Sequence, residues 1–108
     1  MSKETVNFQR VSRVLKHEDL FGNTSSLAEV EIRRGLIEDE YKSGIMVDFA
    51  NKNIGGGVLN NGAVQEEILF CVFPELVTLI CLCEQLGEQE AVIISGVRKI
   101  NRYTGYSD

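Results

Sequence analysis

The residues best able to do chemistry in this chain are three acidic side chains around a glycine-rich loop. Asp48 precedes the loop, and Glu66 and Glu67 follow it directly after Gln65. Glycine permits positive φ angles and lets a ligand approach backbone N–H groups, and a carboxyl group can transfer a proton to or from a substrate. This order of residues predicts a site for a ligand that lies against loop backbone beside acidic groups.

The glycine run in this loop fits neither common phosphate-binding motif. It is not G-x-G-x-x-G, and no G-K-[ST] follows it. Flexible loops also contain glycine runs, so the run gains its meaning from the acidic residues that follow it. The consecutive glycines of the run are Gly55, Gly56 and Gly57.

Two interpretations of the paired glutamates remain open. Acidic side chains in the first turn of a helix interact favourably with the helix dipole, which is a purely structural role. Alternatively, the apolar neighbours Val64 and Ile68 place at least one carboxyl in a partly buried position. Burial raises the pKa of a carboxyl, as a general acid requires. Successive helical residues diverge by about 100°, so we expect one glutamate to reach into a cleft while the other braces the loop or lies closer to solvent.

Asp48 also has two readings. It ends a short apolar run, and a buried carboxylate without hydrogen-bond donors is unfavourable. It either caps the following loop through an Asx turn, or it holds a ligand hydroxyl or orients loop amides.

The elements around these residues predict a parallel β-α-β unit and hence an α/β fold. Residues 45–49 predict an inner strand buried on both faces, and residues 91–95 predict a second apolar strand. Between them, residues 65–86 predict helical structure, with Pro74 at a first helical position and Gly87 as a C-cap. A right-handed crossover follows, with ligands bound beyond the carboxyl ends of the strands.

The other segments predict supporting structure. Residues 6–11 and 27–32 predict strands, the second with one solvated face, and residues 39–44 predict a polar turn. Residues 15–24 predict a connection with an exposed His17. An apolar stripe at helical spacing consists of Leu76, Leu79, Ile80 and Cys83.

Composition limits the class of protein. The chain has 108 residues, which allows at most one domain, and its net charge of −5 argues against direct DNA or RNA binding. No apolar run is long enough for a membrane helix, and no secretory signal is visible at the N-terminus. The odd number of cysteines, Cys71, Cys81 and Cys83, predicts buried structural thiols in a reduced, intracellular protein.

Four separate motifs resemble those of the poly(ADP-ribose) glycohydrolase family. The glycine run at 55–57, seven intervening residues and Gln65-Glu66-Glu67 look like the family signature, with similar motifs at 47–51, 74–76 and 103–106. Upstream of the signature, residues 35–38 lie at the position in the chain where the family has its adenine-contacting pair. The resemblance covers residues 35–108 strongly. It implies a macrodomain-like α/β/α sandwich with a mixed sheet, present here only in part.

The resemblance implies hydrolysis of ribose–ribose O-glycosidic bonds in poly(ADP-ribose), with release of ADP-ribose and without a metal or cofactor. Glu67 would be the general acid that protonates the leaving hydroxyl and then activates water. Glu66 would position the terminal ribose, and Asp48 would support the loop. The remaining implied substrate contacts are Asn51 and Gln65 to hydroxyls, Ile37 and Glu38 to adenine, and Tyr106 near the pyrophosphate.

The same resemblance implies partners and a location. The partners would be poly(ADP-ribose) or ADP-ribose and ADP-ribosylated proteins, without membrane binding. The location would be the nucleus, the cytoplasm or both, with a role in the DNA damage response and carbohydrate metabolism.

Family members continue beyond the motif at residues 103–106. They carry a second glycine-rich loop, further strands and an accessory helical region. We therefore expect residues 1–108 to form a single, incomplete catalytic domain with an open sheet edge, from a truncated product, a splice form or an incomplete gene model. Two classes of function follow: an active glycohydrolase, or an inactive ADP-ribose-binding or interaction fragment that lacks the pyrophosphate loop.

Overall fold

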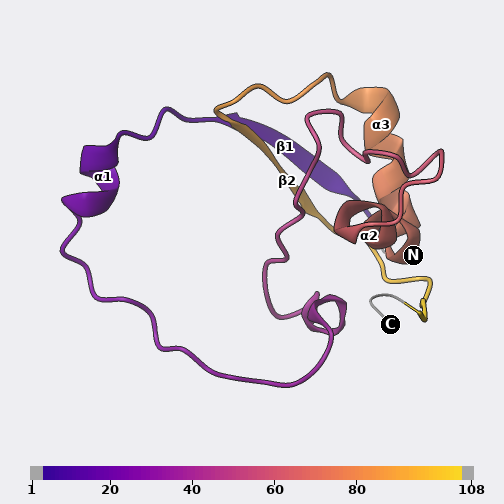
Figure 1. The fold of residues 1–108 in the computed structure, drawn as a ribbon, viewed down its shortest axis with the longest axis horizontal. Helices are drawn as coiled ribbons and strands as arrows, with labels where there is room; N and C mark the ends of the chain where they lie inside the picture. Colours follow the sequence, from indigo (N-terminus) through magenta and orange to yellow (C-terminus); the bar gives the residue numbers. More distant parts are fainter. Residues whose placement is uncertain (1–3, 106–108) are drawn as a thin grey trace.

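The computed structural model describes residues 4–105, which form one packed body with an open arc of chain beside it (Figure 1). The body contains the strands β1 (Asn7–Ser12) and β2 (Glu90–Ser95), the glycine loop and the helices α2 (Gln65–Val72) and α3 (Thr78–Leu82). The arc runs from the end of β1 through the short helix α1 (His17–Phe21) and returns at the 3₁₀ helix η1 (Ile37–Glu40). No helix among residues 4–105 is long and apolar enough to cross a lipid bilayer.

The sheet consists of two antiparallel strands in the described part of the chain. β1 (Asn7–Ser12) pairs with β2 (Glu90–Ser95), so that Asn7 lies opposite Ser95 and Ser12 opposite Glu90. Both strands were predicted, but the parallel β-α-β arrangement is wrong, because β2 pairs with a strand from the other end of the chain. Nor is β2 fully buried, since its side chains alternate between partly buried and exposed.

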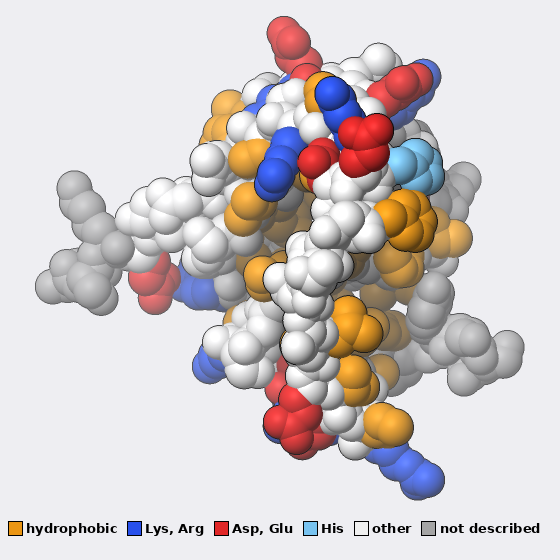
Figure 2. Space-filling model, turned by 90° about the vertical axis from the view of Figure 1, so that its left-hand side faces the viewer, with side chains coloured by type: hydrophobic (Ala, Val, Ile, Leu, Met, Phe, Trp, Pro, Cys, Tyr) orange, Lys and Arg blue, Asp and Glu red, His pale blue; other side chains and the backbone are white. Residues whose placement is uncertain are grey.

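Two predicted strands do not form. Residues 27–32 and 45–49 are extended, but neither pairs with another strand in the described structure. Most of their apolar side chains are exposed, with Leu27 96% and Ile45 97% exposed, whereas Met46 packs against the core. Figure 2 shows hydrophobic side chains on the surface of the side that it presents. An alternating pattern provides an apolar face, but a strand also needs a hydrogen-bonding neighbour, which is absent here.

The predicted helical region is divided at Pro74. α2 spans Gln65–Val72, the 3₁₀ helix η2 spans Pro74–Val77, and α3 spans Thr78–Leu82. The residue before proline is pushed out of the helical region, and Phe73 accordingly has φ −115° and ψ 74°. Pro74 begins η2 as predicted. Gly87 is not a helix C-cap, because α3 already ends at the extended residue Cys83.

The core lies between these helices and the sheet. Phe70, Phe73 and Leu79 are each at most 2% exposed, and the ring of Tyr41 meets that of Phe73 edge to face at 5.3 Å. Each fully buried side chain of this size stabilises the fold by roughly 1.5–3 kcal/mol relative to exposure. The predicted helical stripe is confirmed, since Leu76 and Leu79 are buried while Ile80 and Cys83 pack against the core.

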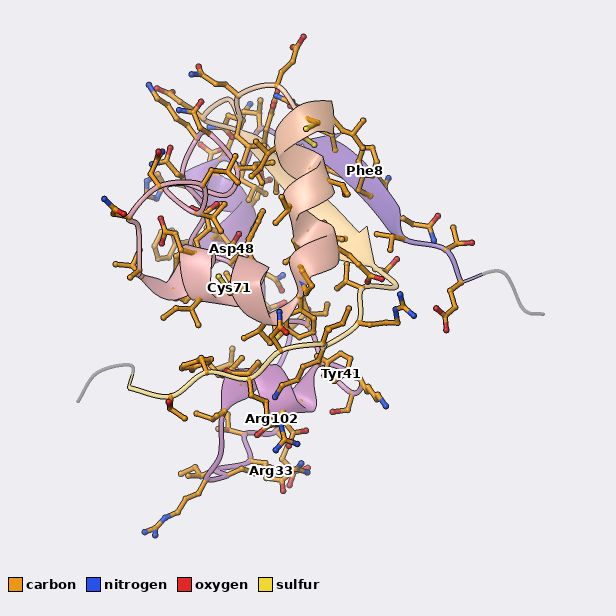
Figure 3. All side chains as sticks on the ribbon, turned by 90° about the vertical axis from the view of Figure 1, so that its right-hand side faces the viewer. Phe8, Arg33, Tyr41, Asp48, Cys71 and Arg102 are labelled. Atoms are coloured by element: carbon orange, nitrogen blue, oxygen red, sulfur yellow. The ribbon has the colours of Figure 1, made fainter. Side chains whose placement is uncertain are left out.

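Two smaller predictions are corrected and one is confirmed. Cys71 and Cys81 are exposed and Cys83 is half-buried, so the prediction of buried thiols is wrong for two of the three. Cys71 lies between the buried residues Phe70 and Val72, on a side of α2 that the core does not cover (Figure 3). The predicted connection at 15–24 contains α1, and His17 within it is exposed as predicted.

Candidate active site

Three consecutive side chains at the start of α2 fasten the glycine loop to the helix. Gln65 holds the segment before the loop: its Oε1 accepts the N–H of Phe49 at 2.9 Å, and its Nε2 donates to Val47 O at 3.1 Å. These two bonds imitate the pairing of a neighbouring strand, which explains why residues 47–49 remain extended without a strand partner.

Glu66 and Glu67 hold the loop itself. Glu66 accepts the N–H groups of Gly55 at 2.6 Å and Asn51 at 3.0 Å. Glu67 accepts those of Gly57 at 2.9 Å and Val64 at 3.0 Å. Glu66 is 3% and Glu67 7% exposed, so these amides satisfy two buried carboxylates.

The loop requires glycines for two reasons: the glutamate carboxylates approach the backbone closely, and some positions have positive φ angles. Gly55 and Gly56 have φ angles of 91° and 50°, which disfavour residues with a Cβ atom. A Cβ atom on Gly56 would lie 2.9 Å from Glu66 Oε2, and one on Gly62 would lie 2.7 Å from Glu67 Oε1. Gly62 therefore belongs to the site as much as the glycine run does.

The three carboxyl groups have different protonation behaviour. The backbone N–H of Gly57, followed by other backbone amides, lowers the pKa of Glu67, although burial acts in the opposite direction. Burial, and then repulsion from Glu66 and Glu67, raises the pKa of Asp48 from 3.8 to about 6. Oδ1 of Asp48 is buried and has no hydrogen-bond partner. Asp48 is thus a carboxyl group that is half-protonated at about pH 6, well above the ordinary range of an aspartate.

These contacts decide between the earlier interpretations. Both glutamates are buried and brace the loop, so the prediction that one reaches into a cleft while the other braces the loop or lies closer to solvent is wrong in its division of roles. Asp48 does not cap the loop through an Asx turn; Asn51 does, with its Oδ1 accepting the N–H of Asn53 at 3.0 Å. The unpartnered carboxyl of Asp48 leaves the ligand-binding reading of that residue open.

An apolar cavity of about 310 Å³ adjoins the carboxyl cluster, which consists of Asp48, Glu66 and Glu67. Gln65, next to Glu66 in the helix, lines the cavity, and so do Ile37 and Glu38. Oε1 of Glu38 is buried without a partner. The cavity combines apolar walls with a few polar groups, which is the usual composition of a small-molecule site. The other lining residues are Gly35, Leu36, Met46, Ile68, Leu69, Val72 and Tyr103.

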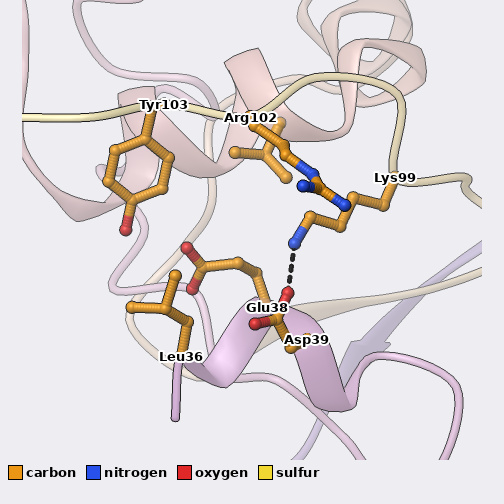
Figure 4. A pocket seen from close by; sticks show the side chains of 7 residues that line it. Leu36, Glu38, Asp39, Lys99, Arg102 and Tyr103 are labelled. Atoms are coloured by element: carbon orange, nitrogen blue, oxygen red, sulfur yellow. Dashed lines mark hydrogen bonds and ion pairs between the residues drawn. The ribbon is translucent and has the colours of Figure 1, made fainter.

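A second hollow of about 240 Å³ shares one wall with the cavity. Figure 4 shows Lys99 and Arg102 projecting into it from one side and Glu38 and Asp39 from the other. The ammonium group of Lys99 pairs with Asp39. No local pattern connects residues 36–39 with residues 99–103, because only the fold brings the two segments into contact.

The structure therefore brings most of the predicted site residues together in two adjoining groups. Asp48, Asn51, Gln65, Glu66, Glu67 and the glycine run form one group, and Ile37 and Glu38 lie in the cavity beside it. Tyr106 lies outside the described residues. Sequence reasoning did not assign Met46 or Leu36 to the site, and their apolar character gave no signal.

Comparison with known proteins gives a family for this arrangement. The family model described as "Poly (ADP-ribose) glycohydrolase (PARG), Macro domain fold" matches residues 17–108. The chain is 39% identical over 106 residues to "Poly(ADP-ribose) glycohydrolase 1" of Caenorhabditis elegans, covering 98% of this chain. It is 38% identical over 104 residues to "Poly(ADP-ribose) glycohydrolase 1" of Arabidopsis thaliana, covering 94% of this chain.

These relatives are much longer than the chain. The matched region makes up 12% of the Caenorhabditis elegans protein and 19% of the Arabidopsis thaliana protein. The strands and helices described above are consistent with part of an α/β macro domain fold.

Proposed function

The chain belongs to the poly(ADP-ribose) glycohydrolase family, and from this premise we propose that it hydrolyses ribose–ribose O-glycosidic bonds of poly(ADP-ribose) and releases ADP-ribose. One observation carries the proposal: the buried Glu66 and Glu67 are held on the amides of a glycine loop, beside a half-buried Asp48. Glycoside hydrolysis needs such carboxyl groups in fixed positions, because one of them must protonate the leaving oxygen.

Glu67 is the proposed general acid and base. In the free protein its amide contacts lower its pKa, so the carboxyl is ionised at neutral pH. A bound polyanionic substrate excludes water and adds negative charge, and both effects raise the pKa of a nearby carboxyl. Glu67 therefore takes up a proton from solvent as the substrate binds and donates it to the glycosidic oxygen, which leaves as a ribose hydroxyl when its bond to the anomeric carbon breaks. The carboxylate then takes a proton from the water that forms the new bond to that carbon.

The neighbouring acids have supporting roles in this proposal. Glu66 anchors the loop through Gly55 and Asn51 and positions the terminal ribose. Asp48, whose pKa is raised to about 6, supplies a carboxyl group that can donate a hydrogen bond to the substrate. Asn51 and Gln65 contact the substrate hydroxyls.

The apolar cavity takes the adenine base. Its apolar walls exclude water from the faces of a planar ring, and the buried Oε1 of Glu38 provides an acceptor for an exocyclic amino group. Ile37 contributes to the same wall. A unit of the polymer would thus extend from the carboxyl cluster at one end of the site to the cavity at the other.

A second candidate function is ADP-ribose binding without catalysis. It is favoured by the same contacts that fix the loop. Two backbone amides donate to Glu66 and two to Glu67, and the contacts to Glu67 lower its pKa. In that case the polymer or ADP-ribosylated proteins bind to the chain but are not cleaved.

The deciding experiment measures ADP-ribose released from labelled poly(ADP-ribose) by the wild-type chain, Glu67→Gln and Glu88→Gln. Glu88 is exposed and serves as the matched change of charge. We expect release by the wild type and by Glu88→Gln, and a loss of at least about 100-fold in Glu67→Gln. Equal release by all three proteins would refute the role of Glu67, and polymer binding without release would support the non-catalytic function.

A further inference from the structure

The hollow beside the cavity is a candidate phosphate subsite. It is lined by Lys99 and Arg102 from the segment after β2, by Glu38 and Asp39 from η1, and by Val72 at the end of α2. Arg102 is exposed, and none of the ion pairs found among residues 4–105 involves it. Its guanidinium group is available to a ligand, and guanidinium groups bind phosphate oxygens through paired donors.

Structural contacts explain the position of these cations only in part. The N–H of Ile100 donates to Val72 O at 3.0 Å, and Nδ2 of Asn101 donates to Cys71 O at 2.8 Å. The segment therefore covers the C-terminal end of α2, where positive charge is favourable. Lys99 additionally pairs with Asp39. These contacts fix the backbone around Arg102 and the side chain of Lys99, but they leave the Arg102 side chain unused.

The hollow lies on the far side of the cavity from the carboxyl cluster. It shares Leu36, Glu38, Val72 and Tyr103 with the cavity, but none of its lining residues comes from the glycine loop or from the first turn of α2. Glu66 and Val72 are separated by about 9 Å along the helix, from the rise of 1.5 Å per residue. In Figure 3, Asp48 and Arg102 lie on opposite sides of α2.

We propose that Arg102, with Lys99 beside it, binds a phosphate of the ADP-ribose unit that adjoins the one held between the carboxyl cluster and the cavity. This inference rests on the proposed function. A unit with its glycosidic bond at Glu67 and its base in the cavity has its own pyrophosphate between these two points. A phosphate beyond the base therefore belongs to the next unit, which is joined through the adenosine ribose. The subsite distinguishes polymer from monomeric ADP-ribose.

The charge distribution supports this placement. The carboxyl cluster repels phosphate from the glycine-loop end of the site. The negative charges of Glu66 and Glu67 are buried, so solvent screens them little. At the other end, Lys99 and Arg102 project into one hollow (Figure 4). The hollow holds two acidic and two basic side chains, since Glu38 lines it together with Asp39, Lys99 and Arg102. Lys99 pairs with Asp39, so the attraction for a phosphate comes from the guanidinium group of Arg102, which takes part in none of the ion pairs of residues 4–105.

The test compares affinity for a linear ADP-ribose trimer with affinity for ADP-ribose, in the wild type, Arg102→Gln and Arg13→Gln. Arg13 lies next to β1, where its N–H donates to Gln89 O at 3.0 Å, and it lines neither hollow, so it controls for the general loss of charge. Titrations are made at 4 °C, and released ADP-ribose is measured in the same samples. We expect the trimer-to-monomer affinity ratio to fall about fivefold in Arg102→Gln and to persist in Arg13→Gln.

An unchanged trimer-to-monomer ratio in Arg102→Gln would overturn the subsite. If both affinities fall by the same factor, the phosphate belongs to the same unit; if neither falls, Arg102 does not bind phosphate. The measurement of released ADP-ribose tests the proposed catalytic function independently of the subsite. A wild-type preference that depends on Arg102, without any release, would support the subsite and contradict catalysis. Binding of neither ligand by the wild type would contradict both.

Discussion

A Cβ atom added to Gly56 would lie only 2.6 Å from Oε1 of Glu67, a carboxylate oxygen that also accepts the N–H of Gly57. The loop and the carboxylate thus occupy nearly the same space, and the loop conformation depends on the absence of a side chain at position 56. Gly56 also has a φ angle of 50°, so two independent constraints select glycine there.

Gly56→Ala should therefore displace the loop from Glu67. We expect a loss of stability of about 1–3 kcal/mol in denaturant unfolding, because the alanine is strained and a buried carboxylate loses a donor. ADP-ribose release should fall in parallel. Gly44→Ala is the control, since the nearest atom to its added Cβ is 3.9 Å away and its φ is not in the positive region. Equal behaviour of the two variants would contradict this account of the loop.

Gln65→Ala should loosen the segment before the loop. Its two hydrogen bonds hold the N–H of Phe49 and the carbonyl of Val47, and each contributes about 1 kcal/mol at most in an exposed position. Amide hydrogen exchange at Phe49 should accelerate by about tenfold or more, whereas exchange in β1 should not change. Gln85→Ala, at an exposed position outside the loop, provides the comparison. Unchanged protection of Phe49 would show that another contact holds the segment.

Asp48→Asn should change the pH dependence of stability. The pKa of Asp48 is raised from 3.8 to about 6, so its contribution to stability is complete below pH 3.8 and is lost as the pH rises to about 6. Above pH 6 the variant should be more stable than the wild type by about 1–2 kcal/mol, after allowance for partial exposure of the carboxyl. Below pH 4 the two proteins should be equally stable.

Urea unfolding at pH 3.5, 5 and 7 measures this difference, with Glu29→Gln as a matched loss of charge on an exposed segment. Glu67 acts in the opposite sense, because its lowered pKa makes stability fall as the pH drops below its ordinary value of 4.5. That effect is present in both proteins and cancels in the comparison. A stability difference that does not vary with pH would rule out a raised pKa of Asp48.

Phe73→Ala should destabilise the chain severely. Phe73 is 0% exposed and contacts Tyr41, so its truncation leaves a cavity that typically reduces stability by 3–5 kcal/mol. Phe21→Ala makes the same chemical change at a position that is 82% exposed, and its effect should remain within about 0.5 kcal/mol. Thermal unfolding followed by circular dichroism measures both. Similar losses in the two variants would mean that the arc around α1 is packed in solution.

The sequence by itself determined the features that depend on neighbouring residues. Pro74 fixes the break between α2 and η2, the helical stripe at Leu76 and Leu79 fixes the buried face, and the glycine run followed by Gln65 fixes where loop gives way to helix. In each case the steric and hydrogen-bonding requirements act over a few residues, so the pattern is sufficient to specify the local structure.

Only the tertiary structure decided the features that depend on partners distant in sequence. β1 pairs antiparallel with β2, which comes from the other end of the chain, and no local pattern specifies that partner. The apolar segments 27–32 and 45–49 remain unpaired for the same reason. The binding of loop amides by both Glu66 and Glu67, and the unpartnered carboxyl of Asp48, arise from how the loop folds back on α2. The way the loop folds back on α2 depends on many contacts between residues distant in sequence, and these contacts cannot be read from a local sequence pattern.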